Sequence, residues 1–379
     1  MWLDDHRPLT QGALAPGRRL EDEAYRPFEL SVIPRDAGPV AVEEAITASL
    51  PYGRLRRFAR AGGPGPGPEG RRRVLVVAPL AGGFPFLMRD LVVALLAIAD
   101  EVAITDWPDA RYVPVEAGTF GFTDNCIETT QMIRALGADG PPPHVVGVCQ
   151  GTVPALAGTL LLAAEGMAPA SLTLMGGPID PSRNPTRLWR MLQDRSLEAL
   201  GQQILEEVPA RFPGAGRRVF PAWRQTDTFA LYLWRQAMTG GRLPLQLAFD
   251  EGDDQIRFAL SRLCWTLMDV PGEFFMENVA TIFRANALAQ GSLAIAGHRL
   301  DGALLRDTAL LTVEGADDDI AAPSQTEAAH ALCPNLPPHL RDHLLVPHAG
   351  HFALFYGRAM RERIIPAIAA TMAASEAAR

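Results

Sequence analysis

The chain is short of cysteine, and the cysteines that it has are scattered. Its 379 residues include four, namely Cys126, Cys149, Cys264 and Cys333, with no CxxC pair and no Cys/His spacing typical of metal ligands. A disulfide framework and a structural zinc site both depend on such spacing. We therefore expect a chain that suits a reducing cytoplasm, with no metal and no other cofactor.

Clustered positive charge is also missing. The chain has 35 basic and 43 acidic residues, a formal net charge of -8, and no basic block on any predicted helix. A protein that binds the phosphate backbone of a nucleic acid carries a basic patch or stripe. We therefore expect no nucleic-acid partner.

Long apolar runs are absent as well. The first thirty or so residues are studded with Asp, Glu and Arg and contain no apolar stretch of the kind that export signals have. The apolar run at 91–99 is too short to cross a bilayer. The sequence thus predicts no export signal, no membrane span and a cytoplasmic location.

Apolar residues are nevertheless plentiful, at 48% of the chain, which is enough for one large core. The Gly/Pro-rich stretch at 61–70 can hold neither a helix nor a strand, so it predicts a linker. We predict an N-terminal arm with its linker at residues 1–72. A catalytic core follows in two parts, at 73–180 and 303–379, and a helical cap at 181–302 is inserted between them.

After the linker, short apolar runs alternate with helical stretches. Strands are predicted at 74–79, 102–105, 145–148, 171–174, 309–313 and 344–346, and helices at 86–99, 125–136, 152–165, 325–332 and 359–373. Such alternation predicts an α/β fold with a mostly parallel sheet and helices on both faces.

The predicted cap is rich in aromatic residues. They include Trp223, Phe229, Trp234, Phe249, Phe258, Trp265, Phe274 and Phe275. Ordinary core packing of a helical subdomain explains them, and an apolar substrate channel is the alternative.

A single turn carries the strongest chemical signal. Cys149 follows an apolar strand and precedes an alanine- and leucine-rich helix, with Gly147 and Gly151 two residues to either side. This is the G-x-S-x-G pattern of a nucleophile elbow with sulfur in place of oxygen. The helix N-terminus that follows favours a thiolate. The same pattern also fits a buried cysteine that packs as a small apolar side chain.

A nucleophilic cysteine needs a base and an acid to orient that base. His351 lies on the loop after the last predicted strand, where an α/β-hydrolase has its histidine, and His348 is the nearby alternative. The loop after the preceding strand holds an acidic run, of which Asp318 is the best candidate and Asp317 and Asp319 stay open.

The attack on a carbonyl also needs an oxyanion hole. The backbone N–H of Gln150, directly after the nucleophile, is one predicted donor. The second is expected from the loop after the first core strand, at Leu80 or Ala81, where Gly82 and Gly83 allow a close approach.

Longer segments resemble the intracellular polyhydroxyalkanoate depolymerases, which attack a stored polyester with a cysteine nucleophile. The matching blocks are 104–107, 109–111, 113–114, 148–150, 153–154, 174–180, 184–186, 208–209, 213–214, 217, 312–315, 318–320, 325–326, 328–330, 332–333 and 350–352. The resemblance runs from about residue 74 to about residue 366. It implies an α/β-hydrolase fold, a triad of Cys149, Asp318 and His351, and the surface of poly(3-hydroxybutyrate) storage granules as substrate.

Two segments depart from that family. The loop after the first core strand, at 79–83, lacks the Ser and His that the family has there. The cap run at 259–265 lacks the family's Tyr-Asp-Glu-Tyr pattern. Both lie where the substrate is expected, so the departures point to a different preferred chain length.

Hydrolysis of the polyester is thus the leading hypothesis. A polyhydroxyalkanoate synthase, which transfers acyl groups from coenzyme A thioesters, shares the fold, the elbow and the triad order. A catalytically silent protein that coats the granule is the third hypothesis. The acid-loop block favours the depolymerase over the synthase, and the complete set of triad candidates disfavours the silent protein. The oligomeric state stays open, a homo-oligomer included.

Overall fold

The structure, a computed structural model, describes residues 10–11, 24–25, 28, 30–34, 38–61, 72–80, 88–225 and 267–379. Several features named above lie outside these residues. They are most of the Gly/Pro linker, the loop residues Ala81, Gly82 and Gly83, Cys264, the run at 259–265, and the aromatics Phe229, Trp234, Phe249, Phe258 and Trp265.

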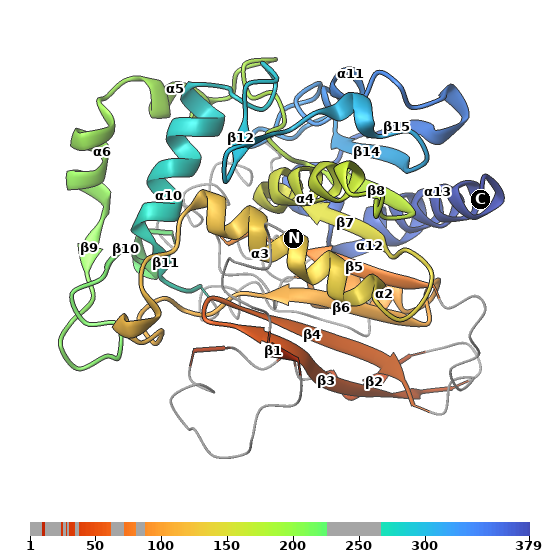
Figure 1. The fold of residues 1–379 in the computed structure, drawn as a ribbon, viewed down its shortest axis with the longest axis horizontal. Coiled ribbons are helices and arrows are strands. Elements are labelled where there is room, and N and C mark those ends of the chain that lie inside the picture. Colours follow the sequence, from red (N-terminus) through yellow and green to blue (C-terminus); the bar gives the residue numbers. More distant parts are fainter. Residues whose placement is uncertain are drawn as a thin grey trace.

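A mostly parallel sheet forms the core of the molecule (Figure 1). Six strands of the described chain run parallel in the order β6-β5-β7-β8-β14-β15. Their bounds are β5 (Arg73–Val77), β6 (Glu101–Asp106), β7 (His144–Val148), β8 (Ser171–Met175), β14 (Ala309–Gly315) and β15 (Arg341–Val346). Every residue of the first five in this list is buried, which explains their continuous apolar sequences.

The strand order locates the reactive end of the sheet. The chain passes from β5 outward to β6 and then returns to β7 on the other side of β5. Such a reversal opens a crevice at the carboxyl ends of the two central strands, where α/β proteins bind their ligands. The turn after β7 lies at this point.

The residues before the linker extend the same sheet, which corrects the expectation that residues 1–72 form a separate arm. Strands β3 (Val40–Leu50) and β4 (Gly53–Arg60) pair with each other, and β4 pairs antiparallel with β6. Two short strands, β1 (Thr10–Gln11) and β2 (Val32–Ile33), pair with β3.

The arginines of β4 explain why its sequence did not predict a buried strand. Arg56 is buried, and its Nε donates to Asp106 Oδ2 at 2.8 Å. Burial raises the pKa of Asp106 to about 6, although the charge and hydrogen bond of Arg56 act to lower it. Arg54 is also buried and lies 3.7 Å from the centre of the Tyr25 ring. Each arginine thus contacts a partner that is distant in sequence, a carboxylate for Arg56 and an aromatic ring for Arg54.

Helices cover both faces of the sheet (Figure 1). Helices α3 (Phe122–Gly137) and α4 (Thr152–Ala164) lie side by side on one face, and α13 (Ile365–Ala377) lies on the other. The remaining core helices are short: α2 (Arg89–Leu95), α11 (Ala329–Leu332) and α12 (Gly357–Ala359). The α/β class, the parallel sheet and the covering helices are as the sequence predicted. No described helix is both long enough and apolar enough to cross a membrane.

Between β8 and β14 the chain leaves the sheet and forms the region that we call the cap, residues 181–302. Its described helices are α5 (Arg187–Gln193), α6 (Leu197–Ile204), α10 (Gly272–Asn278) and the π-helix Val279–Arg284. It also holds the small sheet β11-β10-β9 and the hairpin β12-β13, with bounds Glu206–Glu207 (β9), Arg218–Phe220 (β10), Val270–Pro271 (β11), Ala294–Ile295 (β12) and His298–Arg299 (β13). Of its described aromatics, Phe274 is buried, Phe275 is half-buried and Trp223 is exposed.

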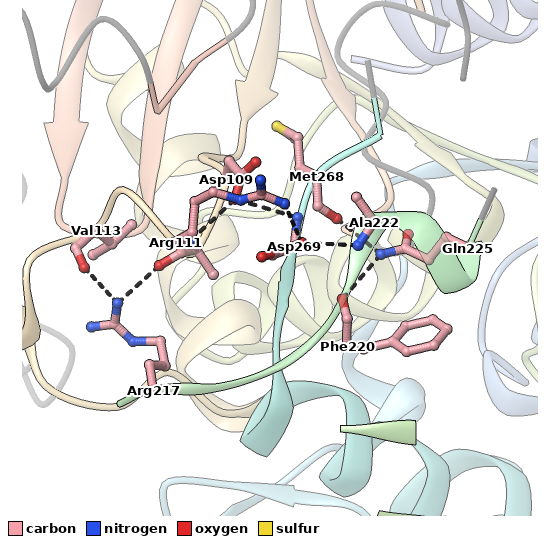
Figure 2. A network of polar contacts seen from close by, with 10 residues as sticks. Asp109, Arg111, Val113, Arg217, Phe220, Ala222, Gln225, Met268 and Asp269 are labelled. Atoms are coloured by element: carbon pink, nitrogen blue, oxygen red, sulfur yellow. Dashed lines mark hydrogen bonds and ion pairs between the residues drawn. The ribbon is translucent and has the colours of Figure 1, made fainter. Parts of the chain in front are cut away.

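A polar network fastens the cap to the loop after β6 (Figure 2). The Arg111 side chain donates to Asp269 Oδ1 at 2.6 Å and to Asp109 Oδ1 at 3.2 Å. Arg217 of the cap donates to the carbonyl oxygens of Ala110 and Val113. Since Asp109 and Asp269 are both buried, Arg111 supplies the charge that stabilises them away from water.

Candidate active site

The turn after β7 has the geometry of a nucleophile elbow. Cys149 lies at φ +51°, in the left-handed region that non-glycine residues rarely occupy, and α4 begins three residues later. The Thr152 hydroxyl donates to the Cys149 carbonyl at 2.7 Å and closes the turn. Such strain concentrates at functional sites. Cys149 is half-buried, whereas Cys126 and Cys333 are fully buried.

The two glycines of the elbow allow strand and helix to touch. A β-carbon at Gly151 would lie 2.2 Å from the Val77 carbonyl oxygen at the end of β5. A β-carbon at Gly147 would lie 2.8 Å from the Ala155 β-carbon on α4. Only glycine permits both approaches, so the elbow spacing has a steric cause. The elbow and the strand order together identify the α/β-hydrolase fold.

His351 and Asp318 lie together, each at the start of a loop beyond its strand. The His351 Nδ1 lies 2.7 Å from Asp318 Oδ2, and both side chains are buried. The other carboxylate oxygen of Asp318 accepts the backbone N–H groups of Ile320 and Ala321, each at 2.9 Å. Asp318 is therefore held as an oriented acceptor for the histidine. Its neighbour Asp317 is exposed.

His351 also contacts the sulfur of the elbow. Burial alone lowers the pKa of His351, but the charges of Asp318 and Cys149 and hydrogen bonds to both raise it well above its ordinary value. The structure thus brings Cys149, His351 and Asp318 into one chain of contacts. The alternative base, His348, is exposed at φ +57° in the preceding turn.

Two side chains that the sequence analysis did not single out hold the loops of the site. Glu314, fully buried at the end of β14, accepts the backbone N–H groups of Ser324, Thr326 and Glu327 at 2.6 to 2.9 Å. The Thr326 hydroxyl in turn bonds both backbone groups of Gly177, after β8. Glu314 thus closes the loop that carries Asp318. A carboxylate inside an apolar strand was the available signal, because a buried charge requires such partners.

Glu314 also belongs to a group with metal-ligand chemistry. Its carboxylate, that of Glu327 and the imidazole of His343 place ligand atoms within 4.8 Å of one another. Both oxygens of Glu314 already accept backbone N–H groups, so its structural role accounts for its burial. We assign no metal to this group.

The predicted oxyanion-hole residues are placed in part. Gln150 lies in the turn just before α4, with its backbone next to the nucleophile, and is half-buried. Leu80 is buried just beyond β5, close in sequence to Ala78, whose carbonyl accepts the Trp107 indole N–H at 2.9 Å. Ala81 lies outside the described residues. The oxyanion hole therefore stays a prediction.

One protein family and several solved structures resemble the chain. The family profile described as PHB de-polymerase C-terminus matches residues 176–376, more than half of the chain. No curated protein matches the chain.

Three solved structures illustrate the structural likeness. The bromoperoxidase from Bacillus anthracis has 12% identity and a TM-score of 0.48, covering 88% of this chain and 98% of its own. The monoacylglycerol lipase of Paleococcus ferrophilus has 14% identity and a TM-score of 0.45, covering 85% and 99%. A thermophilic esterase from Thermogutta terrifontis has 13% identity and a TM-score of 0.44, covering 89% and 95%.

Proposed function

The chain belongs to the PHB de-polymerase C-terminus family and is an ester hydrolase, and from this premise we propose that it cleaves stored polyhydroxyalkanoate, with poly(3-hydroxybutyrate) as its polymer. We propose Cys149, His351 and Asp318 as the catalytic residues. The observation that carries this proposal is the 2.7 Å contact between His351 and Asp318, on a histidine that also contacts a cysteine at a left-handed elbow.

The first half of the reaction forms an acyl-enzyme. His351 takes the thiol proton of Cys149, and the sulfur attacks the ester carbonyl carbon. Asp318 accepts a hydrogen bond from the imidazolium and holds its ring in place. When the tetrahedral intermediate collapses, the ester C–O bond breaks and the alcohol end of the polymer leaves with the proton from His351. A thioester on Cys149 remains.

Water completes the cycle. His351 removes a proton from a water molecule, which attacks the thioester carbon, and the C–S bond breaks as His351 returns that proton to the sulfur of Cys149. The product is a hydroxy acid or oligomer, whose new carboxyl group then ionises. The negative oxygen of both intermediates needs N–H donors, and we propose those of Gln150 and of Leu80 or Ala81.

The location follows from the substrate. A stored polyester is insoluble, so we propose that the enzyme works at the surface of granules in the cytoplasm. The exposed Trp223 of the cap is one apolar side chain available there.

Product analysis on native-state, amorphous poly(3-hydroxybutyrate) granules tests the proposal. We expect soluble hydroxy acid or oligomers from the parent protein, and a loss on the order of a thousand-fold or more in Cys149→Ala. Cys126→Ala, which removes a buried thiol on α3, is the matched control and keeps the activity. Full activity in Cys149→Ala sinks the mechanism. Growth of polymer from 3-hydroxybutyryl-coenzyme A indicates a synthase instead, and binding without turnover indicates a coat protein.

A further inference from the structure

A hollow of about 650 Å³ lies where the end of the cap meets the core. Its walls come from the cap turn at 288–291, the hairpin strand β13 with the residues after it, and the core helices α4 and α11. The volume falls within the range of roughly 300–1,000 Å³ that is common for small-molecule sites.

The hollow is separate from the triad. None of Cys149, His351 and Asp318 lines it. The residue that α4 contributes is Leu160, eight residues after Thr152 at the start of the helix, which is roughly 12 Å along its axis.

Cap and core are packed tightly at the edge of this hollow. A β-carbon at Gly302 would lie 1.8 Å from the Leu332 carbonyl oxygen of α11, so the backbones touch there. The tight backbone packing between cap and core fixes this wall, so the hollow is preformed.

Most of the wall is apolar. Leucine side chains from both regions line it: Leu160, Leu288, Leu293, Leu300 and Leu332. Such a wall suits short alkyl groups.

The lining also holds three polar residues, Gln290, Arg299 and Asp301, of which the two charged ones are exposed to solvent. Arg299 is oriented by one hydrogen bond, from its Nε to the Gly291 carbonyl at 2.7 Å, and within the described chain its terminal amino groups have no partner. Asp301 accepts the Ala303 N–H at 2.9 Å through Oδ1, and its Oδ2 has no partner there either. Although only two residues apart, the two charges form no ion pair with each other.

This combination matches one ligand chemistry. A guanidinium with free terminal nitrogens binds a carboxylate with two parallel hydrogen bonds. A carboxylate oxygen accepts a hydrogen bond from a hydroxyl group. We propose that the hollow is a second binding site, for a short linear oligomer of a 3-hydroxy acid, with its terminal carboxylate on Arg299, its terminal hydroxyl on Asp301 and its alkyl groups on the leucines. That this ligand is also the enzyme's product rests on the proposed function.

Calorimetric titration with the linear trimer of 3-hydroxybutyric acid, as its carboxylate, tests the site. The protein carries Cys149→Ala, so that the trimer is not consumed. We expect Arg299→Met to weaken binding at this site at least ten-fold and Arg299→Lys to weaken it less. The methyl ester of the trimer has no carboxylate. It should bind to the Cys149→Ala protein as weakly as the acid binds to the same protein with Arg299→Met added.

Arg306→Met is the matched control, because Arg306 is exposed and does not line the hollow. It keeps the affinity of the parent. Equal affinity in Arg299→Met and the parent, or no binding of the trimer, overturns the second site. The granule assay tests the proposed function separately. Trimer binding through Arg299 without granule hydrolysis overturns the proposed function and leaves the second site. Granule hydrolysis without trimer binding through Arg299 overturns the second site and leaves the proposed function.

Discussion

The charge on His351 is set by opposing effects that meet at one side chain. Burial disfavours the imidazolium, whereas Asp318 and Cys149 favour it strongly enough to raise the pKa of His351 well above its ordinary value. The same interactions link the proposed triad to the stability of the fold.

His351 therefore makes stability depend on pH. Its folded pKa lies above that of an unfolded histidine, about 6.5, so its stabilisation is complete below about pH 6.5 and is lost as the pH rises through the folded pKa. We expect the free energy of unfolding of the parent, relative to His351→Gln, to fall as the pH rises above about 6.5, by up to about 1.4 kcal/mol per pH unit. Urea unfolding at several pH values measures this. His351→Gln should also abolish hydrolysis.

His348→Gln is the matched control for that variant. His348 is exposed, so its replacement should change neither the hydrolysis nor the pH slope of stability. A loss of activity in His348→Gln together with an active His351→Gln would reassign the base.

The three described thiols should differ in reactivity. Burial raises the pKa of Cys333 to about 12 and that of Cys126 still higher, whereas Cys149 is partly exposed next to His351. Because the thiolate is the reactive form, iodoacetamide at pH 8 should label Cys149 well before the other two. Peptide mapping by mass spectrometry measures each site. Labelling of Cys126 or Cys333 at the rate of Cys149 would contradict this picture.

At the scale of elements, the central strands, the elbow and the loops that carry Asp318 and His351 were predictable because each follows from local sequence. A buried parallel strand needs only a short apolar run, and Gly147 and Gly151 mark a close approach. Strand β4 was missed because Arg54 and Arg56 find their partners far away in the sequence. The roles of Glu314 and Thr326 were missed for the same reason, since both depend on contacts between loops.

Gly151 tests whether the elbow depends on contact between β5 and α4. Gly151→Ala places a β-carbon 2.2 Å from the Val77 carbonyl oxygen, so the helix must move away from the strand. We expect a loss of more than about 2 kcal/mol in stability, with hydrolysis reduced even where the protein folds. Thermal unfolding and granule hydrolysis measure the two effects.

Gly166→Ala, at the far end of α4, is the control. A β-carbon there meets no atom within 4 Å, and only the backbone at φ +71° is strained. Its cost should stay within about 1–2 kcal/mol, without loss of activity. If both alanine variants behave alike, steric contact at the elbow is not the cause.

For the whole molecule, the attachment of cap to core is the decisive feature. Arg217 donates to the carbonyl oxygens of Ala110, Val113, Pro114 and Gly118, so a single cap side chain contacts the core loop at four points. The Asp109–Arg111–Asp269 contacts run beside it (Figure 2). Together they set how the cap lies over the sheet.

Removing Arg217 should loosen this attachment. Arg217→Met removes the side-chain donor to the carbonyl groups of Ala110 and Val113, and we expect a loss of about 1–3 kcal/mol in the free energy of unfolding. Arg211→Met, which removes an exposed guanidinium 4.9 Å from the Phe212 ring, should cost much less. Denaturant unfolding of both variants measures the difference, and equal costs would show that the carbonyl contacts are dispensable.

The left-handed backbone at Cys149 has an evolutionary consequence. A side chain at φ +51° is under strain, so glycine fits this position better than any residue that carries a β-carbon. Cys149→Gly should therefore be more stable than Cys149→Ala by about 1 kcal/mol in thermal unfolding, the reverse of their usual order. If Cys149 is the nucleophile that we propose, a descendant of this chain released from selection for turnover would gain stability by exchanging it for glycine, and a retained cysteine would be a sign of continued selection for catalysis.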